Sequence, residues 1–237
     1  MRTIPSFSAE KRFLFVLAIG LLAGAHGWAQ TAAKTNLFEQ SFSRFAEEDR
    51  TNPPPAGAIL LVGDSLFRKW QTVREDLPGY QLINRGFGGS MMSDLLVYMD
   101  KLVLPYRPRM IVVNEGGNDL QSGRTPEELL ADVKTFVRRV REVMPDVPIV
   151  FDGLTPSPAR WSSRDERLRF NVMLKSYLAT GKNLIYLDLF DAFLGPDGKP
   201  DETLFLEDRL HNSAKGHAIR ARLMRPLLGP SDFPAPQ

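Results

Sequence analysis

The sequence has no cysteine and only three histidines among its 237 residues, and these shortages narrow its possible chemistry. Without cysteine there is no disulfide, no thiolate metal site and no cysteine nucleophile. Any histidine that acts as a general base must be His26, His211 or His217. A Walker A motif is also missing, so the usual phosphate-binding loop of nucleotide hydrolases is excluded.

The N-terminal segment has an apolar run, but the run is too short to cross a membrane. It covers residues 13–25, whereas a spanning helix needs about 20 apolar residues. Basic residues precede the run, and Gly27 and Ala29 stand at positions −3 and −1 of a cut before Gln30. We therefore predict a cleavable signal peptide over residues 1–29 and a secreted or periplasmic protein. The alternative interpretation is a membrane anchor.

The chain also lacks a large excess of either charge. The formal net charge is +2, and removal of the predicted signal peptide leaves equal numbers of basic and acidic residues. A neutral mature chain lacks the excess of positive charge that attracts nucleic-acid phosphates, so we expect no nucleic-acid partner. Hydrophobic residues make up 43% of the sequence, which is enough for a sizeable core in a chain of this length.

Residues 30–57 are predicted to form a helix followed by a proline-rich lead-in. Consecutive prolines in the segment 52–55 end the helix, because they remove donors and fix φ. The apolar residues with helical spacing are Leu37, Phe38, Phe42 and Phe45.

Beyond the prolines, short apolar runs alternate with helical segments. The predicted strands are residues 58–62, 81–84, 110–114, 148–152 and 184–188, and the predicted helices are 92–103, 126–144, 165–180 and 214–227. The runs are apolar throughout, as in strands that are covered on both faces. This alternation predicts one α/β domain over residues 58–230, with helices on both sides of a parallel sheet. Ligands of such domains bind beyond the carboxyl ends of the strands.

Two glycine-rich clusters follow the first two predicted strands. Gly63-Asp64-Ser65 follows the first strand, and its serine can face the ligand crevice, although taken alone a helix cap is the commoner role. Residues 84–90 carry several glycines, which let a backbone approach a ligand and point N–H groups at it. A plain tight turn is the alternative for this second cluster.

Two further clusters supply an amide and a histidine. Asn118 follows Gly116-Gly117 after the third strand, and its NH₂ group can stabilise an oxyanion or simply form a turn. Asp208 precedes His211 by three residues, so its carboxylate can reach Nδ1 and leave Nε2 free to accept a proton from a serine. His217 has no acidic residue close before it, so His211 is the better candidate for a base.

Together the four clusters resemble the SGNH (GDSL-type) hydrolase superfamily. Gly-Asp-Ser, Gly-x-x-Gly, Gly-x-Asn-Asp and Asp-x-x-His occur in that order, each at a strand end or before the last helix. The resemblance is greatest to the bacterial branch related to platelet-activating-factor acetylhydrolase, and it covers residues 36–228. It implies a flavodoxin-like three-layer α/β/α sandwich with a parallel five-stranded sheet in the order 2-1-3-4-5.

The resemblance implies a catalytic triad. Ser65 is then the nucleophile, His211 the general base and Asp208 its orienting partner. Ester hydrolysis by this route passes through an acyl-enzyme and needs no metal or organic cofactor. Since an ordinary histidine has a pKa of about 6.5, we expect activity to fall on acidification through that range.

The resemblance also implies an oxyanion hole. Its donors are the backbone N–H of Ser65, the backbone N–H of Gly89 and the side chain of Asn118, with Gly88 as the nearest rival of Gly89.

The substrate is predicted only as a class. Relatives in the superfamily take short acyl esters, lysophospholipids, thioesters and acetylated sugars, so we expect a small ester, either lipid or acetylated sugar. Arg160 lies in the proline-rich loop after the fourth strand and is expected to face solvent, with contact to an anionic group as the alternative. Residues that can line an acyl or alcohol pocket are Phe67, Trp70, Met91, Met92 and Trp161, with core packing as the alternative for Phe67 and Trp70.

The sequence therefore predicts a serine esterase acting on short-chain acyl esters. One alternative is a secreted, non-catalytic glycan-binding module of the same fold. Another is a carbohydrate O-acetyltransferase or deacetylase that uses the same residues. A third is a metal-dependent hydrolase using Asp208, His211 and His217, which the six-residue spacing of the two histidines disfavours.

Overall fold

The computed structural model describes residues 37–230. The predicted signal peptide, residues 1–29, lies outside the described residues and stays a prediction. The described residues fall into two units, 37–47 and 48–230, and each is described by itself. The predicted sandwich domain, residues 58–230, falls within the second unit.

The predicted N-terminal helix is present over residues 37–51. Phe38, Phe42 and Phe45 are buried, as their spacing predicts. The rings of Phe38 and Phe42 lie 6.3 Å apart, one helical turn from each other. Leu37 differs from the prediction: it is 57% exposed and does not belong to the apolar stripe.

The second unit contains a five-stranded parallel sheet with the order β2-β1-β3-β4-β5. Both the fold class and the strand order that the sequence predicts are confirmed. The strands are β1 (Ile59–Gly63), β2 (Leu82–Gly86), β3 (Met110–Asn114), β4 (Ile149–Asp152) and β5 (Leu184–Leu187).

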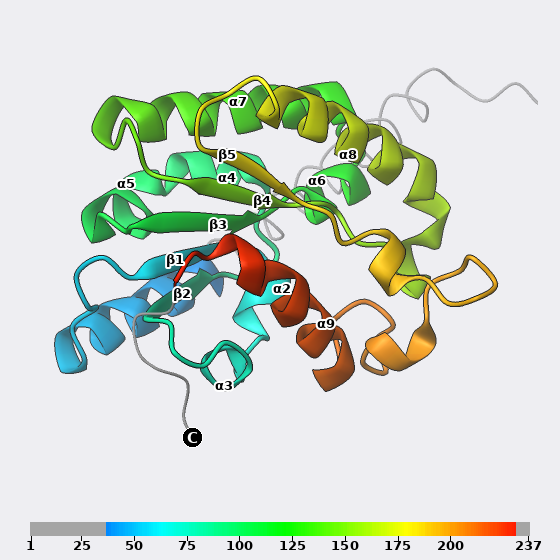
Figure 1. Cartoon of the computed structure of the whole chain (residues 1–237), viewed down its shortest axis with the longest axis horizontal. Coiled ribbons are helices and arrows are strands. Elements are labelled where there is room, and N and C mark those ends of the chain that lie inside the picture. The colour runs from blue at the N-terminus through cyan, green and yellow to red at the C-terminus, as the bar shows by residue number, and fades with distance from the viewer. Residues whose placement is uncertain (1–36, 231–237) are drawn as a thin grey trace, which may run out of the picture. The chain divides into compact units, whose positions relative to one another are not determined.

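Helices cover both faces of this sheet. In Figure 1, α7 and α8 lie on one side of the strands, and α3 and α9 lie on the other. The helices are α2 (Ser65–Arg68), α3 (Val73–Asp76), α4 (Met92–Val97), α5 (Met99–Leu102), α6 (Gly117–Gln121), α7 (Pro126–Val143), α8 (Arg164–Leu178) and α9 (Ala214–Met224). The predicted helix over residues 92–103 is thus broken into α4 and α5 at Tyr98.

The strands bury their side chains on both faces because successive residues point in opposite directions. Alternate strand residues such as Ile59, Leu61 and Val112 join a core cluster that includes residues of α2, α3 and α9. On the opposite face, Phe151 of β4 meets Phe136 of α7 edge to face, with ring centroids 6.0 Å apart. The continuous apolar runs in the sequence therefore reflect a sheet that packs against helices on each side.

Sequence-coded caps fix the start of the longest helix, α7. The Thr125 hydroxyl accepts the Glu128 N–H at 3.2 Å, and the Glu128 carboxylate accepts the Thr125 N–H at 2.8 Å. Pro126 occupies the first helical position, where its missing N–H costs nothing. These reciprocal hydrogen bonds form a capping box.

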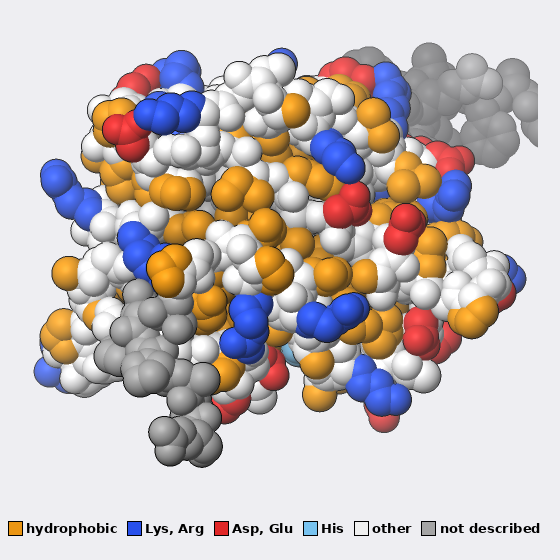
Figure 2. Space-filling model, in the orientation of Figure 1, with side chains coloured by type: hydrophobic (Ala, Val, Ile, Leu, Met, Phe, Trp, Pro, Cys, Tyr) orange, Lys and Arg blue, Asp and Glu red, His pale blue; other side chains and the backbone are white. Residues whose placement is uncertain are grey.

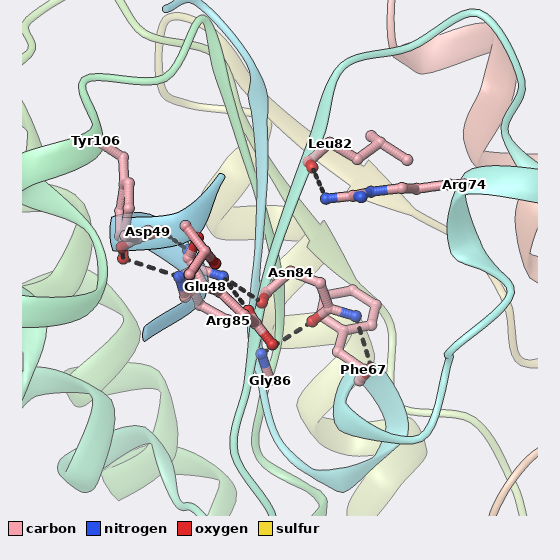
Figure 3. Close-up of polar contacts among 10 residues, drawn as sticks. Glu48, Asp49, Phe67, Arg74, Leu82, Asn84, Arg85, Gly86 and Tyr106 are labelled. Carbon is pink, nitrogen blue, oxygen red and sulfur yellow. Dashed lines mark hydrogen bonds and ion pairs between the residues drawn. The ribbon is translucent and has the colours of Figure 1, made fainter. Parts of the chain in front are cut away.

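Arg85 of β2 is a buried cation that is held by several polar groups (Figure 3). Its guanidinium donates to Glu48 at 3.2 Å, to the Tyr106 hydroxyl at 2.8 Å and to Asp49. These contacts offset the cost of burying its charge.

Charges of both signs are scattered over the molecular face drawn in Figure 2. Lysine and arginine side chains are interspersed there with acidic ones, and the described residues form no broad basic patch on that face. This distribution agrees with the near-zero net charge of the predicted mature chain.

Candidate active site

Ser65 follows β1 directly and is the first residue of α2. The helix is capped by Asp64, whose Oδ1 accepts the Leu66 N–H at 2.8 Å. Gly63 has φ +153°, and a Cβ at this position would lie 2.1 Å from the Asn114 carbonyl oxygen, so only glycine fits between β1 and β3. Because Asp64 supplies the cap, the interpretation of Ser65 as a capping residue is wrong, and its hydroxyl is available for chemistry.

A chain of hydrogen bonds joins Ser65 to Asp208 through His211. The Ser65 Oγ lies 2.8 Å from His211 Nε2, and His211 Nδ1 lies 2.6 Å from Asp208 Oδ2. Of the two candidate histidines, His211 is therefore the one that the fold brings to the serine. The arrangement matches the geometry in which a histidine takes a proton from a serine.

Opposing effects set the pKa of Asp208. Partial burial raises this pKa, while hydrogen bonds from the His211 backbone, the His211 ring and the Leu210 backbone lower it. The hydrogen bonds prevail and hold the pKa well below its ordinary range. Lys69 Nζ, 3.4 Å from Asp208 Oδ2, adds a nearby positive charge. Asp208 therefore stays ionised at neutral pH and keeps the imidazole proton on Nδ1, which leaves Nε2 as the acceptor.

Residues 206–211 carry the histidine and the aspartate, and we call them the catalytic loop after the role that we propose for them below. The Leu206 N–H donates to the His211 carbonyl at 2.8 Å, and the Ala159 N–H donates to the Arg209 carbonyl at 3.0 Å. Arg209 has φ +56°, the left-handed conformation of a tight turn. The loop is thus closed on itself and attached to the segment that follows β4.

Asn118 of α6 lies beside the glycine-rich turn. Its Nδ2 donates to the Ser90 carbonyl at 2.8 Å, and its Oδ1 accepts a hydrogen bond from Arg160 Nη2 at 2.8 Å. These two partners fix the orientation of the amide. A carboxamide nitrogen carries two hydrogens, so one N–H of Asn118 remains to stabilise a developing negative charge.

The glycine-rich turn is attached to α2 by Asn84 (Figure 3). Asn84 Nδ2 donates to the Phe67 carbonyl at 2.8 Å, and Asn84 Oδ1 accepts the Gly86 N–H at 2.9 Å. Gly89 is exposed with φ +80°, and its amide makes no hydrogen bond to another described residue. An exposed, unused N–H at this turn is available for an oxyanion hole.

Glu115, just before Gly116-Gly117, is a buried carboxyl group that contacts the glycine-rich turn of residues 84–90. Its Oε1 lies 2.5 Å from the Ser90 hydroxyl, which also lies 2.9 Å from the Phe87 carbonyl. Burial raises the pKa of Glu115 well above its ordinary value, and the nearby Asp64 raises it further. A hydroxyl has one hydrogen to donate. A protonated Glu115 can donate from Oε1 to Ser90 while Ser90 donates to Phe87, and only Glu115 Oε2 is left without a partner among the described residues.

A second set of buried polar side chains lies beneath the strand ends, and we call Asp64, Asn114, Asp152 and Arg220 the buried network. Asn114 Nδ2 donates to Asp64 Oδ1 at 2.9 Å, and Asn114 Oδ1 accepts from Arg220 at 3.2 Å. Arg220 also pairs with Asp152. The network connects the cap of α2 to β3, β4 and α9.

Arg160 does not face solvent as the sequence suggests, because it is partly buried and bonded to Asn118. It lines a small pocket beside Ser65 together with Arg167 of α8. The other lining residues are Asp64, Ser65, Leu66, Asn114, Gly117, Leu154, Thr155, Ser157 and Leu210. Arg167 and Ser157 belong to no recognisable sequence motif, so sequence alone does not single them out.

The aromatic and methionine residues predicted to line a substrate pocket lie elsewhere. Phe67 is fully buried in the core with Trp70, so the core-packing alternative is correct for both. Met92 is also buried. Met91 is half-buried before α4, and Trp161 is half-buried with the Arg164 guanidinium 5.6 Å from its ring. Neither Met91 nor Trp161 lines the pocket beside Ser65.

His217 does not join Asp208 and His211. It is buried in α9, and its ring stacks on Trp70 with centroids 5.3 Å apart. Among the described residues, no group of three or more His, Cys, Asp or Glu side chains is arranged to hold a metal ion. The donor set required by the metal-dependent alternative is therefore not assembled here.

Residues 55–219 match the model of the GDSL-like lipase/acylhydrolase family. The chain belongs to this family. The match confirms the predicted resemblance, and it also confirms the predicted enzyme class, because the family is one of carboxylic ester hydrolases. No sequence among the curated proteins is similar enough to count as a relative of this GDSL-like hydrolase.

Solved structures share the fold of this GDSL-like hydrolase at low sequence identity. A protein described as a platelet activating factor from Streptococcus pneumonia has 18% identity and a TM-score of 0.74, with 90% of this chain and 99% of that chain covered. An acylhydrolase from Bacteroides fragilis has 17% identity and a TM-score of 0.69, with 78% and 94% covered. An acetyl-xylooligosaccharide esterase variant from Geobacillus Stearmophilus has 17% identity and a TM-score of 0.62, with 77% and 99% covered. At these identities the likeness establishes the fold alone.

None of the helices in residues 37–230 is both long enough and apolar enough to cross a membrane.

Proposed function

We propose that this GDSL-like hydrolase is a serine esterase that cleaves short-chain acyl esters through Ser65, His211 and Asp208. The observation that carries the proposal is the unbroken chain of hydrogen bonds from Asp208 through His211 to the Ser65 hydroxyl. The depressed pKa of Asp208 supports it, since an ionised partner favours the histidine tautomer that accepts the serine proton.

The reaction proceeds in two steps, acylation of Ser65 and deacylation of the acyl-enzyme. The Ser65 proton moves to His211 Nε2 as Oγ bonds to the ester carbonyl carbon, and the carbonyl electron pair moves onto oxygen. The tetrahedral intermediate collapses, the C–O bond to the alcohol breaks, and His211 returns the proton to the leaving oxygen. A water molecule then attacks the carbonyl carbon of the acyl-enzyme while His211 Nε2 takes its proton. The bond between the acyl group and Ser65 Oγ breaks, the acid leaves, and His211 returns the proton to Ser65.

The oxyanion is stabilised by neutral N–H donors. The donors in this proposal are the backbone amides of Ser65 and Gly89 and the free N–H of Asn118. Arg160 supports the arrangement because it fixes the carboxamide through Oδ1. Losing one donor of an oxyanion hole typically lowers the rate by about 10²–10³.

The walls beside Ser65 favour a small acyl group. Leu66, Leu154 and Leu210 supply limited apolar surface, and the other pocket residues are polar, charged or glycine. A long fatty-acyl chain would have to cover these polar groups without satisfying them, which is costly. We therefore expect acetyl and similar short groups to react faster than octanoyl groups.

The proposal is tested by hydrolysis of 4-nitrophenyl acetate, butyrate and octanoate. The wild type should show rates that decrease with chain length, and Ser65→Ala should lose activity by about 10⁴-fold or more. A fluorophosphonate should label the wild type at Ser65 and leave Ser65→Ala unlabelled. A folded wild type that neither hydrolyses these esters nor takes the label would instead favour the non-catalytic, glycan-binding alternative.

Acetylated sugars are the natural esters to try next. The fold neighbour from Geobacillus Stearmophilus is an acetyl-xylooligosaccharide esterase, which supports a sugar acetate as one candidate substrate. Transfer of the acetyl group to a second sugar would use the same acyl-enzyme. The ratio of free acetate to acetylated acceptor separates deacetylation from transfer.

We further propose that the protein is exported, in agreement with the basic, apolar and small-residue pattern of residues 1–29. N-terminal sequencing of the protein from culture medium or periplasm tests this, with a mature chain starting near Gln30 as the expected result.

A further inference from the structure

The pocket beside Ser65 contains a buried cation with an unused donor. Arg167 is 4% exposed, and its Nε and Nη1 donate to Ser163 Oγ at 3.1 Å and to the Thr155 carbonyl at 3.3 Å. Its Nη2 has no hydrogen-bond partner among the described residues. Because an unsatisfied buried charge is costly, this N–H group points to a ligand that the pocket receives.

A second unused polar group lines the same pocket. The Ser157 hydroxyl is 3% exposed and also has no partner within residues 37–230. It lies in the loop between β4 and α8 that also carries Arg160. Both unpartnered groups can donate hydrogen bonds, so together with Arg160 they suit a hydrogen-bond acceptor.

The charged side chains that line this pocket do not neutralise one another. A Cβ on Gly117 would lie 3.3 Å from Arg160 Nη1, 3.8 Å from Asp64 Oδ2 and 3.9 Å from Arg167 Nη1, so the three charged groups converge there. Neither arginine forms an ion pair in the described part of the chain. Burial and the neighbouring Arg160 together lower the pKa of Arg167 to about 10, against the opposing effect of Asp64, so Arg167 remains charged at neutral pH. One carboxylate facing two guanidinium groups leaves an excess of positive charge.

We propose that this pocket binds a carboxylate carried by the ester substrate, a short spacer away from the reacting carbonyl. The inference rests on the proposed esterase function, because it uses the same Ser65. A guanidinium offers paired N–H donors that match a planar carboxylate, and the Ser157 hydroxyl supplies a further donor. Since Ser65, Arg160 and Arg167 line one small pocket, the ester and the anion belong to one small molecule.

The carboxylate can be on the acyl half or on the alcohol half of the ester. Two pairs of substrates, each a charged ester and its neutral counterpart, distinguish these positions. Monoethyl succinate carries the carboxylate on the acyl half, and ethyl levulinate replaces it with a neutral methyl ketone. Acetoxyacetate carries it on the alcohol half, and acetoxyacetone is its neutral counterpart. Hydrolysis of each ester is followed by proton NMR, with Ser65→Ala as the background.

The expected result is a preference for one charged ester that depends on the pocket. Charge-assisted hydrogen bonds predict a wild-type kcat/KM ratio, charged over neutral, that is roughly 10- to 100-fold higher than the ratio in Arg167→Met. Comparing ratios between variants cancels the intrinsic reactivity of the esters. Arg167→Lys, which keeps a charge, should recover part of the preference.

Two further variants guard against misfolding and unspecific charge effects. Ser157→Asp places a competing carboxylate in the pocket without removing a hydrogen bond present in the described structure, and it should also abolish the preference. Arg169→Gln removes an exposed arginine of the same helix, α8, which pairs with Glu127. It should leave the charged-to-neutral ratio as in the wild type.

The outcomes separate the two proposals. Ser65-dependent hydrolysis with the same charged-to-neutral ratio in wild type, Arg167→Met and Ser157→Asp overturns the carboxylate pocket and leaves the esterase intact. If neither these esters nor the 4-nitrophenyl esters are hydrolysed, the esterase proposal fails, and calorimetric titration with succinate tests the carboxylate pocket by itself. Saturable binding that Ser157→Asp abolishes supports the pocket, and absence of saturable binding to the folded wild type overturns it.

Discussion

Asp208 and Asp152 are both aspartates paired with a basic side chain, yet their surroundings drive their pKa values in opposite directions. Asp208 is 41% exposed in the catalytic loop, and hydrogen bonds from His211 and Leu210 hold its pKa low. Asp152 is completely buried, and desolvation raises its pKa to about 6 in spite of Arg220. The number of donors around a carboxylate, and not the presence of a cation alone, decides which effect prevails.

The difference indicates separate tasks for the two regions. The catalytic loop is closed by local hydrogen bonds and carries the proposed acid–base pair near solvent. The buried network holds β1, β3, β4 and α9 together beneath Ser65, where an unpaired charge is expensive. We therefore expect loop substitutions to reduce catalysis with little loss of stability, and network substitutions to reduce stability first.

The largest effect is expected for His211→Ala in the catalytic loop. Removal of the base leaves the Ser65 hydroxyl without a proton acceptor, so kcat for 4-nitrophenyl acetate should fall by about 10⁴-fold or more. The thermal midpoint should remain within a few degrees of the wild type, because the side chain is near the surface and, within residues 37–230, forms hydrogen bonds only to Ser65 and Asp208.

The exposed neighbour Glu207 supplies the control for this loop. Glu207→Gln removes one charge without touching the triad and should retain nearly full activity. A large drop in the thermal midpoint of His211→Ala would contradict the view that the loop contributes little to stability.

Asp152→Ala is expected to reduce the free energy of unfolding, by somewhat less than His211→Ala raises the activation free energy of the reaction. The substitution leaves Arg220 buried without its carboxylate, and breaking a buried pair in this way costs about 3–5 kcal/mol of unfolding free energy. Chemical denaturation followed by circular dichroism measures the loss.

The matched control is Asp188→Ala. Asp188 directly follows β5, as Asp152 ends β4, but it is exposed and lies 3.5 Å from the equally exposed Lys175. Exposed pairs contribute little, so its free energy of unfolding should change by less than about 1 kcal/mol. If both variants lost the same free energy of unfolding, burial of the Asp152–Arg220 pair would not explain the loss in Asp152→Ala.

The fold could be predicted from sequence because its signals are local. The apolar runs, the Thr125–Glu128 capping box and the order of the polar clusters each depend on neighbouring residues. The positions of Ser65, Asn118 and His211 at the same edge of the sheet follow, since parallel strands present their carboxyl ends together.

The rest depends on packing between distant segments. Arg160 stands in a loop whose composition suggests solvent, and only the approach of Asn118 turns it inward. Phe67 lies two residues after the serine and has the character of a pocket residue, but α2 directs it into the core. Burial of Glu115 likewise depends on how the turns after β2 and β3 pack, which sequence spacing does not specify.

The smallest predicted effect concerns His217, a buried histidine outside both regions. Burial, aided by the nearby Arg220 and opposed by Asp76, lowers its pKa to about 4. In the unfolded chain the pKa is about 6.5. As the pH falls below 6.5, the unfolded state binds a proton that the folded state binds only near pH 4. Stability is therefore lost across this interval, by up to about 3 kcal/mol.

The contribution of His217 is isolated by comparison with His217→Phe, which retains a flat ring against Trp70 and removes the titration. Urea unfolding of both proteins from pH 8 to pH 4 gives the difference in free energy at each pH, so other titrating groups cancel, including Asp152, whose pKa of about 6 falls in the same window. The wild type should lose stability relative to His217→Phe as the pH falls from 6.5 to 4. A constant difference would mean that His217 titrates alike in both states, and that its burial against Trp70 has no electrostatic cost.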